Sequence, residues 1–179
     1  MSSLSSRSFG LVLAIAALLA IASTVSLAAP SFAAEPTGGD LAVANELAVE
    51  QALFDDTNAD RAANGLPALD FDTQTLSIAR QRAATQLDAD NLSHYAPDGS
   101  LAFVDLLNAA HLGFALAGEN LARSSSSNPD VITRIEQALM QSPTHRKNIL
   151  EPTFARLAIG AATDPSGRIA FAEIFRSAD

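Results

Sequence analysis

Apolar residues recur at helical spacing in two stretches near the start of the predicted domain. Over residues 41–64 this spacing predicts a helix, and Gly65 marks its end. Over residues 72–87 an apolar face returns at the same spacing, and Asp72 is placed to cap the start of a second helix. The pattern therefore predicts two successive amphipathic helices, with residues 67–71 extended between them.

Caps and prolines mark three further helices. Ser100 precedes an apolar run that ends at Gly113, which predicts a short helix with Ser100 as its cap. An Asn-Pro pair begins a helix over residues 128–141, and a Ser-Pro pair begins another over residues 142–150, because proline fits the first turn of a helix. In the second pair, Ser142 is the predicted cap.

Two apolar runs near the end of the chain predict a β-hairpin. They cover residues 156–162 and 168–175 and flank the turn sequence Asp-Pro-Ser-Gly. Glu173 lies in the second run, and the pattern leaves open whether it faces solvent or a cleft. Amphipathic helices around a small antiparallel sheet indicate a layered α+β domain.

The first 34 residues have the pattern of a secretion signal. Arg7 is followed by an apolar run over residues 11–22 and then by small residues. The run is short for a membrane span, which needs about 20 apolar residues, so no stable span is expected after cleavage. An uncleaved anchor helix is the alternative. We therefore expect a signal peptide over residues 1–34, a linker over 35–40 and one secreted domain over 41–179.

Composition excludes several classes of function. The chain has 20 acidic and 11 basic residues, and its net charge of −9 argues against nucleic-acid binding, which needs a basic face. The absence of cysteine excludes disulfides, cysteine-based zinc sites and a lipoprotein anchor. The stability of the domain must therefore come from packing, and its chemistry from histidines and acids.

Two histidines and one acid are the candidate chemical groups. His94 and His145 lie in a loop and at a helix start, and Glu119 lies in an otherwise apolar segment, where a buried acid needs partners. These side chains suit a divalent metal, acid–base chemistry, or plain hydrogen bonding of loops onto the domain. Ser142 beside His145 also suggests a nucleophile, but as a helix cap its hydroxyl is expected to face the backbone N–H of His145. The third histidine, His111, is predicted on a surface helix.

Four motifs in order resemble the CAP superfamily, which comprises cysteine-rich secretory, antigen 5 and pathogenesis-related proteins. The similarity is to the bacterial secreted type that lacks cysteines. The motifs are N-x-x-R-x-x-x-G-L-x-x-L over residues 58–69, L-S-H-Y-A-P-D-G over 92–99, G-E-N-L over 118–121 and S-P-T-H-R-K-N-I-L over 142–150. Residues 159–160 and 171–175 are similar to the family's closing hairpin, so the resemblance covers nearly all of residues 41–176.

The resemblance implies a three-layer α-β-α sandwich with a cleft, in which two histidines and two acids hold divalent metals. Carried over to this chain, the histidines are His94 and His145, and one acid is Glu119. The second acid falls on Ser142, which departs from the pattern of the animal and plant branch. The resemblance thus implies a cation such as Zn²⁺ or Mg²⁺ held by three protein groups and water.

We expect a secreted, non-enzymatic binding module with no catalytic residue. Its cavity is expected to be formed by His94, Glu119, Ser142 and His145 and to take a divalent cation or a small or lipidic ligand. Two alternatives stay open: a metal-assisted hydrolase with Glu119 as general base, and a cell-surface interaction protein with an inert cleft. The partner is therefore expected to be a small molecule, a lipid or another surface molecule.

Overall fold

The structure is a computed structural model that describes residues 38–126 and 130–178. Its elements follow in the order α1 (Gly38–Ala63), β1 (Asp70–Phe71), α2 (Leu76–Asp88), α3 (Ala102–Ala109), β2 (Ala117–Ser124), α4 (Asp130–Gln141), α5 (Pro143–Ile149), β3 (Phe154–Thr163) and β4 (Ile169–Ser177). The expected signal peptide and the Asn-Pro pair expected to begin α4 lie outside the described residues, and α1 begins inside the expected linker. No helix in these described stretches combines the length and apolar character that crossing a membrane requires.

Within the described residues, four strands form one sheet in the order β1-β3-β4-β2. β3 and β4 form the predicted hairpin, which turns at Gly167, where a φ of +84° favours glycine. β2 pairs antiparallel with β4 on the other side, and the two-residue β1 pairs parallel with β3. The antiparallel hairpin is therefore confirmed, and β2 adds a third long antiparallel strand, at the edge of the sheet, that the sequence did not predict.

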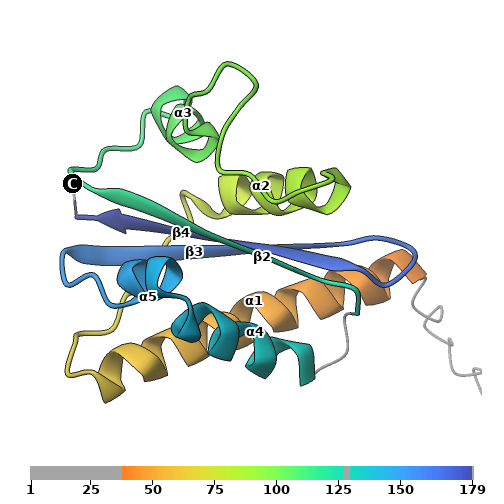
Figure 1. Ribbon diagram of the computed structural model, residues 1–179, viewed down its shortest axis with the longest axis horizontal. Helices are drawn as coiled ribbons and strands as arrows, with labels where there is room; N and C mark the ends of the chain where they lie inside the picture. Colours follow the sequence, from red (N-terminus) through yellow and green to blue (C-terminus); the bar gives the residue numbers. More distant parts are fainter. Residues whose placement is uncertain (1–37, 127–129, 179) are drawn as a thin grey trace, which may run out of the picture. The chain divides into compact units, whose positions relative to one another are not determined.

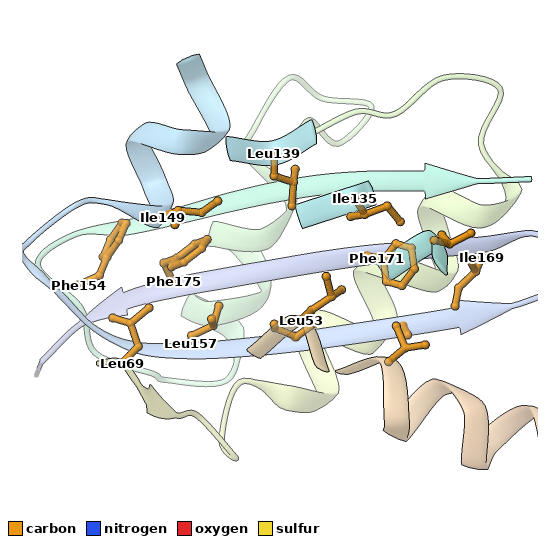
Figure 2. Close-up of a cluster of buried hydrophobic side chains, with 14 residues drawn as sticks. Leu53, Leu69, Ile135, Leu139, Ile149, Phe154, Leu157, Ile169, Phe171 and Phe175 are labelled. Carbon is orange, nitrogen blue, oxygen red and sulfur yellow. The ribbon is translucent and has the colours of Figure 1, made fainter. Parts of the chain in front are cut away.

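Helices cover both faces of the sheet, which gives the predicted α-β-α arrangement (Figure 1). On one face, α2 and α3 pack on the sheet through a cluster that includes Ile78, Phe103 and Ile174. On the other face, α1, α4 and α5 enclose a larger cluster that includes Leu53 and Phe171 (Figure 2). Removal of these apolar side chains from water is the main force that holds the layers together.

Helix α2 lies against β3 at a position where the strand has no side chain. A Cβ atom on Gly160 would stand 2.2 Å from backbone atoms of both Ala79 and Arg80. The missing side chain therefore sets how closely α2 approaches the sheet. This approach fixes the position of the side chains that α2 directs toward the candidate site.

The predicted start of the second helix is wrong. α2 begins at Leu76, four residues after Asp72. The carboxylate of Asp72 instead accepts the backbone N–H of Thr75 at 3.2 Å and forms a buried ion pair with Arg176 at 2.8 Å. Asp72 thus caps the turn that leads into α2 and ties this turn to β4.

The predicted cap of the third helix is also wrong. α3 begins at Ala102, and the hydroxyl of Ser100 donates to Asp98 at 2.7 Å within the preceding loop. His111 lies beyond the end of α3 rather than on it, exposed and with a φ of +55°. The short polar side chains before the helix bond each other, which removes Ser100 from the capping role.

Candidate functional site

The edge strand β2 carries Glu119 between the two helical layers. In the register with β4, Glu119 lies opposite Ile174, so both side chains face α2 and α3. Asn120 lies opposite Glu173, and both face α1, α4 and α5. The sequence of this segment predicts no strand, and pairing with β4 is what makes it one.

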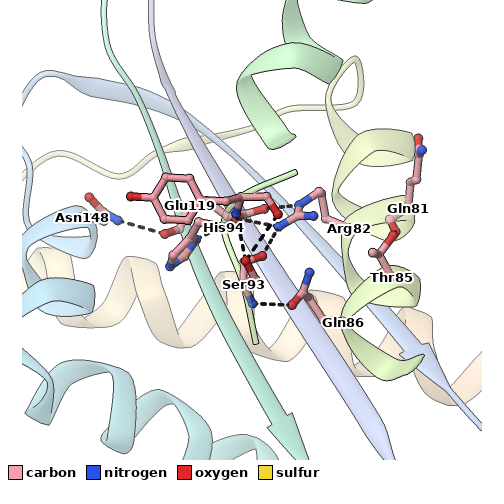
Figure 3. A network of polar contacts seen from close by, with 9 residues as sticks. Gln81, Arg82, Thr85, Gln86, Ser93, His94, Glu119 and Asn148 are labelled. Atoms are coloured by element: carbon pink, nitrogen blue, oxygen red, sulfur yellow. Dashed lines mark hydrogen bonds and ion pairs between the residues drawn. The ribbon is translucent and has the colours of Figure 1, made fainter. Parts of the chain in front are cut away.

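Glu119 is buried and is held by two side chains, as Figure 3 shows. Arg82 of α2 donates to Oε1 of Glu119 through Nε at 2.7 Å and to Oε2 through Nη2 at 3.1 Å. Nδ1 of His94 lies 2.8 Å from the same Oε2 atom. An ionised carboxylate has no proton to donate, so the His94 nitrogen beside it must be the donor. We therefore assign the single proton of the neutral His94 ring to Nδ1. Nε2 of His94 is then the nitrogen with a free lone pair.

The loop that carries His94 is fixed to α2 through its neighbour Ser93. Nη2 of Arg82 donates to the carbonyl oxygen of Ser93 at 2.7 Å, and the N–H of Ser93 donates to Oε1 of Gln86 at 2.8 Å. Arg82 and Gln86 are buried and lie one helical turn apart on α2. Neither side chain was predicted, because in the sequence alone Arg82 and Gln86 resemble solvent-facing residues of an amphipathic helix.

His145 lies on α5, in the helical layer opposite α2. Burial lowers the pKa of His145 below its ordinary value of 6.5, and the charge of nearby His94 lowers this pKa further. The two histidines thus come from different layers, and His94 is near enough for its charge to affect the His145 ring. At neutral pH the ring of His145 is uncharged and has a lone pair available.

Ser142 is the residue before α5, but its hydroxyl does not cap the helix. The hydroxyl lies 3.2 Å from the hydroxyl of Thr144, so the prediction that it faces the N–H of His145 is wrong. The Thr144 hydroxyl, two residues on, offers Ser142 an alternative partner. A relay from Ser142 through His145 to Glu119 is not formed among the described residues, because Glu119 bonds Arg82 and His94.

A second polar network lies on the other face of β2. Asn148 of α5 donates to the backbone carbonyl of Glu119 at 3.2 Å and to Oδ1 of Asn120 at 2.9 Å. Asn120 in turn donates to Glu173 at 2.9 Å, and the Thr57 hydroxyl donates to Glu173 at 3.3 Å. Glu173 is therefore buried, at 1% exposed, and faces neither solvent nor the cleft.

A cavity of about 590 Å³ opens beside His145. Its lining includes Ser142 and His145, but it includes neither His94 nor Glu119. The four residues predicted to form one cavity are therefore divided. Two line the open space, and two belong to the buried ion network next to it.

The available metal donors differ from the set that the resemblance implies. Both carboxylate oxygens of Glu119 already accept hydrogen bonds from Arg82 or His94. Across residues 38–126 and 130–178, no group of three His, Cys, Asp or Glu side chains is arranged to hold a metal ion. The imidazoles of His94 and His145 remain as donors, and metal binding stays a prediction.

Comparison with known proteins gives consistent matches. The model of the CAP (cysteine-rich secretory protein) family matches residues 54–175. The uncharacterized protein YkwD of Bacillus subtilis is 30% identical over 119 residues, which cover 66% of this chain and 44% of YkwD. An extracellular protein of Bacillus anthracis that contains an SCP domain has a TM-score of 0.67 at 30% identity, over 80% of this chain and 45% of that protein.

A more distant structure shows the same fold. An outer surface protein of Borrelia burgdorferi has a TM-score of 0.61 at 15% identity, over 74% of this chain and 94% of that protein. At this identity the likeness concerns the fold alone. The chain spans less than half the length of the two Bacillus proteins, at 44% and 45%.

Proposed function

Because the chain belongs to the CAP family of cysteine-rich secretory proteins, we propose that it is an extracellular, non-enzymatic binding module with a divalent-cation site at His94 and His145. The similar Bacillus anthracis protein is described as extracellular, which supports this location. The apolar run over residues 11–22, preceded by Arg7, supports secretion. A fold does not determine a function, so the argument for binding rests on the site itself.

The observation that carries the proposal is the buried contact of Glu119 with both Arg82 and His94. Glu119 orients the ring of His94 and keeps its proton on Nδ1, which leaves Nε2 to act as a ligand. His145, uncharged because its pKa is lowered, supplies a second nitrogen. A divalent cation would complete its coordination with water and would attract an anionic or carbonyl group of a ligand.

The same contacts argue against a hydrolase. A general base must take a proton from water, but Glu119 is buried and its charge is paired with Arg82. We therefore assign Glu119 to positioning His94. The cavity beside His145 falls in the range of about 300–1,000 Å³ that is typical of ligand sites, so there is room for a ligand beside the cation.

Calorimetric titration of Zn²⁺ and Mg²⁺ into the purified protein tests the cation site. We expect one of the two cations to bind with one-to-one stoichiometry and a Kd of about 1 μM. Binding should be lost in His94→Ala and in His145→Ala. Glu119→Gln should weaken binding by about 10-fold to 100-fold, as for a group that orients a ligand.

The third histidine offers a matched control. His111 is exposed and lies after α3, outside the candidate site, so His111→Ala should bind the cation as the wild type does. Binding that survives both cleft substitutions would contradict the proposal. So would binding that His111→Ala weakens as strongly as His94→Ala does.

A further inference from the structure

The cavity beside His145 runs along the free edge of β2. Residues 121–126 line one side of it, Arg134 and Ala138 of α4 line another, and Leu92 borders it from the loop after α2. We call this space the β2-edge groove. Of these residues, 121–124 belong to β2, and four extended residues span about 13 Å, so a peptide strand of about four residues can lie beside them.

The hydrogen bonds of β3 establish which residues of the sheet bond to which neighbour. The N–H groups of Ala161 and Thr163 donate to side chains of α1, to Glu50 at 3.1 Å and Glu46 at 2.7 Å. In an antiparallel ladder, alternate residues direct both backbone groups to opposite sides. Ala162, which lies between them, therefore bonds to β4.

The same alternation continues across β4 to β2. Ala162 lies opposite Ala170, so the even-numbered residues of β4 bond to β3 and the odd-numbered ones bond to β2. Phe171 and Glu173 are odd-numbered, and they lie opposite Ala122 and Asn120. The even-numbered residues of β2 are thus the ones bonded to β4.

The odd-numbered residues of β2 direct their backbone groups away from the sheet. The carbonyl of Glu119 shows this direction, since it accepts the side chain of Asn148 at 3.2 Å. Leu121 and Arg123 are also odd-numbered, so their backbone groups point in the same direction as those of Glu119. Both residues line the groove. In the part of the chain that the structure describes, no protein group bonds their outward N–H and C=O groups.

The groove combines apolar surface with positive charge. Leu92 and Leu121 supply apolar surface, and Arg134 is exposed. Arg123 adds a second charge, held in place because its guanidinium donates to the carbonyl of Gln86 at 3.0 Å. None of the described lining residues is acidic, although the whole chain carries a net charge of −9. The local charge therefore favours an anionic ligand.

We propose that the β2-edge groove binds an extended acidic peptide, which joins the sheet as a strand beside β2. Its backbone would exchange hydrogen bonds with Leu121 and Arg123, and its alternate side chains would contact α4 and Leu92. A carboxylate of the peptide would pair with Arg134. A fatty acid would use the apolar surface and the charge, but it would leave the outward backbone groups of β2 unbonded. The peptide site goes beyond the proposed cation site. His145 lines the groove as well, but the contacts proposed for the peptide use Leu121, Arg123 and Arg134 and not the His145 ring.

Selection of a displayed heptapeptide library on the full protein tests the proposal. We expect enriched sequences that alternate β-branched with other residues, contain aspartate or glutamate, and bind with a Kd of about 10 μM or lower. Ala138→Trp fills the groove from an exposed helical position and should weaken binding by at least about tenfold. Ala84→Trp makes the same change on the exposed face of α2, outside the groove, and should leave binding unchanged.

Peptides methylated at single amides separate strand addition from mere filling of the groove. Methylation of an amide that faces β2 removes a donor and should weaken binding by at least about tenfold, whereas the amides between should tolerate methylation. In the complex, the amide protons of Leu121 and Arg123 should exchange with solvent more slowly than in the free protein.

Three results would overturn the proposal. The first is a selection that yields no peptide whose binding depends on Ala138. The second is an equal loss of affinity at every methylated amide, without alternation. The third concerns a fatty acid: the wild-type protein binds sodium laurate, Ala138→Trp abolishes that binding, and the wild-type protein binds none of the selected peptides. Peptide binding should persist with EDTA and in His94→Ala, so failure of the cation site and failure of the peptide site are distinguishable.

Discussion

At the cleft, one buried carboxylate is shared by a guanidinium and an imidazole. The side chains of Arg82 and Glu119 are 4% and 0% exposed, so removal of either leaves an unpaired charge away from water. We expect Arg82→Met to lower the free energy of unfolding by about 3–5 kcal/mol, measured by urea denaturation. The double variant Arg82→Met/Glu119→Leu should regain most of this loss, because neither charge remains. A double variant no more stable than Arg82→Met would contradict this account.

The charge of one cleft histidine affects the protonation of the other. Burial and the charge of His94 both lower the pKa of His145, so His94→Ala should raise this pKa. The pKa should stay below the ordinary value, since burial remains. NMR titration of the His145 ring measures the change, and His111→Ala is the control that should leave it unaltered. An unchanged pKa in His94→Ala would place the two rings too far apart to share a cation.

Single residues of the site differ in how well the sequence predicts them. His94, Glu119 and His145 could be selected because histidines are few and an acid in an apolar segment needs a partner. The partner itself could not be identified, since Arg82 resembles any solvent-facing arginine of an amphipathic helix until α2 is packed on the sheet. Ser142 shows the reverse case: its pattern places the start of α5 correctly, but its hydroxyl turns to Thr144.

At the scale of elements, the contact of α2 with β3 depends on one missing side chain. The atoms that a Cβ on Gly160 would meet belong to the backbone of α2 and cannot rotate away. We expect Gly160→Ala to lower the free energy of unfolding by at least about 3 kcal/mol, the upper part of the range for overpacked cores, in urea denaturation. Retention of wild-type stability would mean that α2 can move outward without loss of the Arg82–Glu119 contact.

The helices were predictable where apolar residues recur at helical spacing or where a proline marks a helix end. The strand β2 was not predictable. The ends of α1 and α4 fall within one residue of the expected ends, because glycine and proline act locally. The sequence of β2, A-G-E-N-L-A-R-S, has few residues that favour strands and no alternation of apolar with polar positions. It is a strand because β4 supplies eight paired positions, an interaction between segments far apart in the chain.

Across the whole molecule, α4 is held over the sheet beside a group of buried acids. Glu136 of α4 and Glu173 of β4 are both buried on this side of the sheet. Burial, and then the carboxylates of Glu173, Asp60 and Asp56, raise the pKa of Glu136 to about 9. Burial also raises the pKa of Glu173 to about 7. The packing of α4 on the sheet therefore buries acids that are neutral in the folded protein at slightly acidic pH.

Raised pKa values of acids make the fold sensitive to alkaline pH. Above pH 4.5 the unfolded chain ionises these groups while the folded protein keeps their protons, so their stabilisation is complete below that pH and declines as pH rises toward 9. We expect the free energy of unfolding, measured in urea, to fall by at least about 2 kcal/mol between pH 5 and pH 9. Acids with lowered pKa values, such as Asp72 and Asp164, make the stability depend on pH only at more acidic pH than this range.

A matched pair of variants assigns this pH dependence. Glu136→Gln should flatten the decline, whereas Asp88→Asn, at an exposed acid of α2, should leave it unaltered. Because Glu136 belongs to α4, its ionisation should loosen that helix first, and amide exchange at pH 9 should be faster in α4 of the wild type than in α4 of Glu136→Gln. Exchange in α2 should be the same in both proteins, since its contacts with Glu119 and the sheet do not involve Glu136. If α2 and α4 lost protection together, the two helical layers would open as one unit, and the acids would act on the whole fold rather than on the wall of the β2-edge groove.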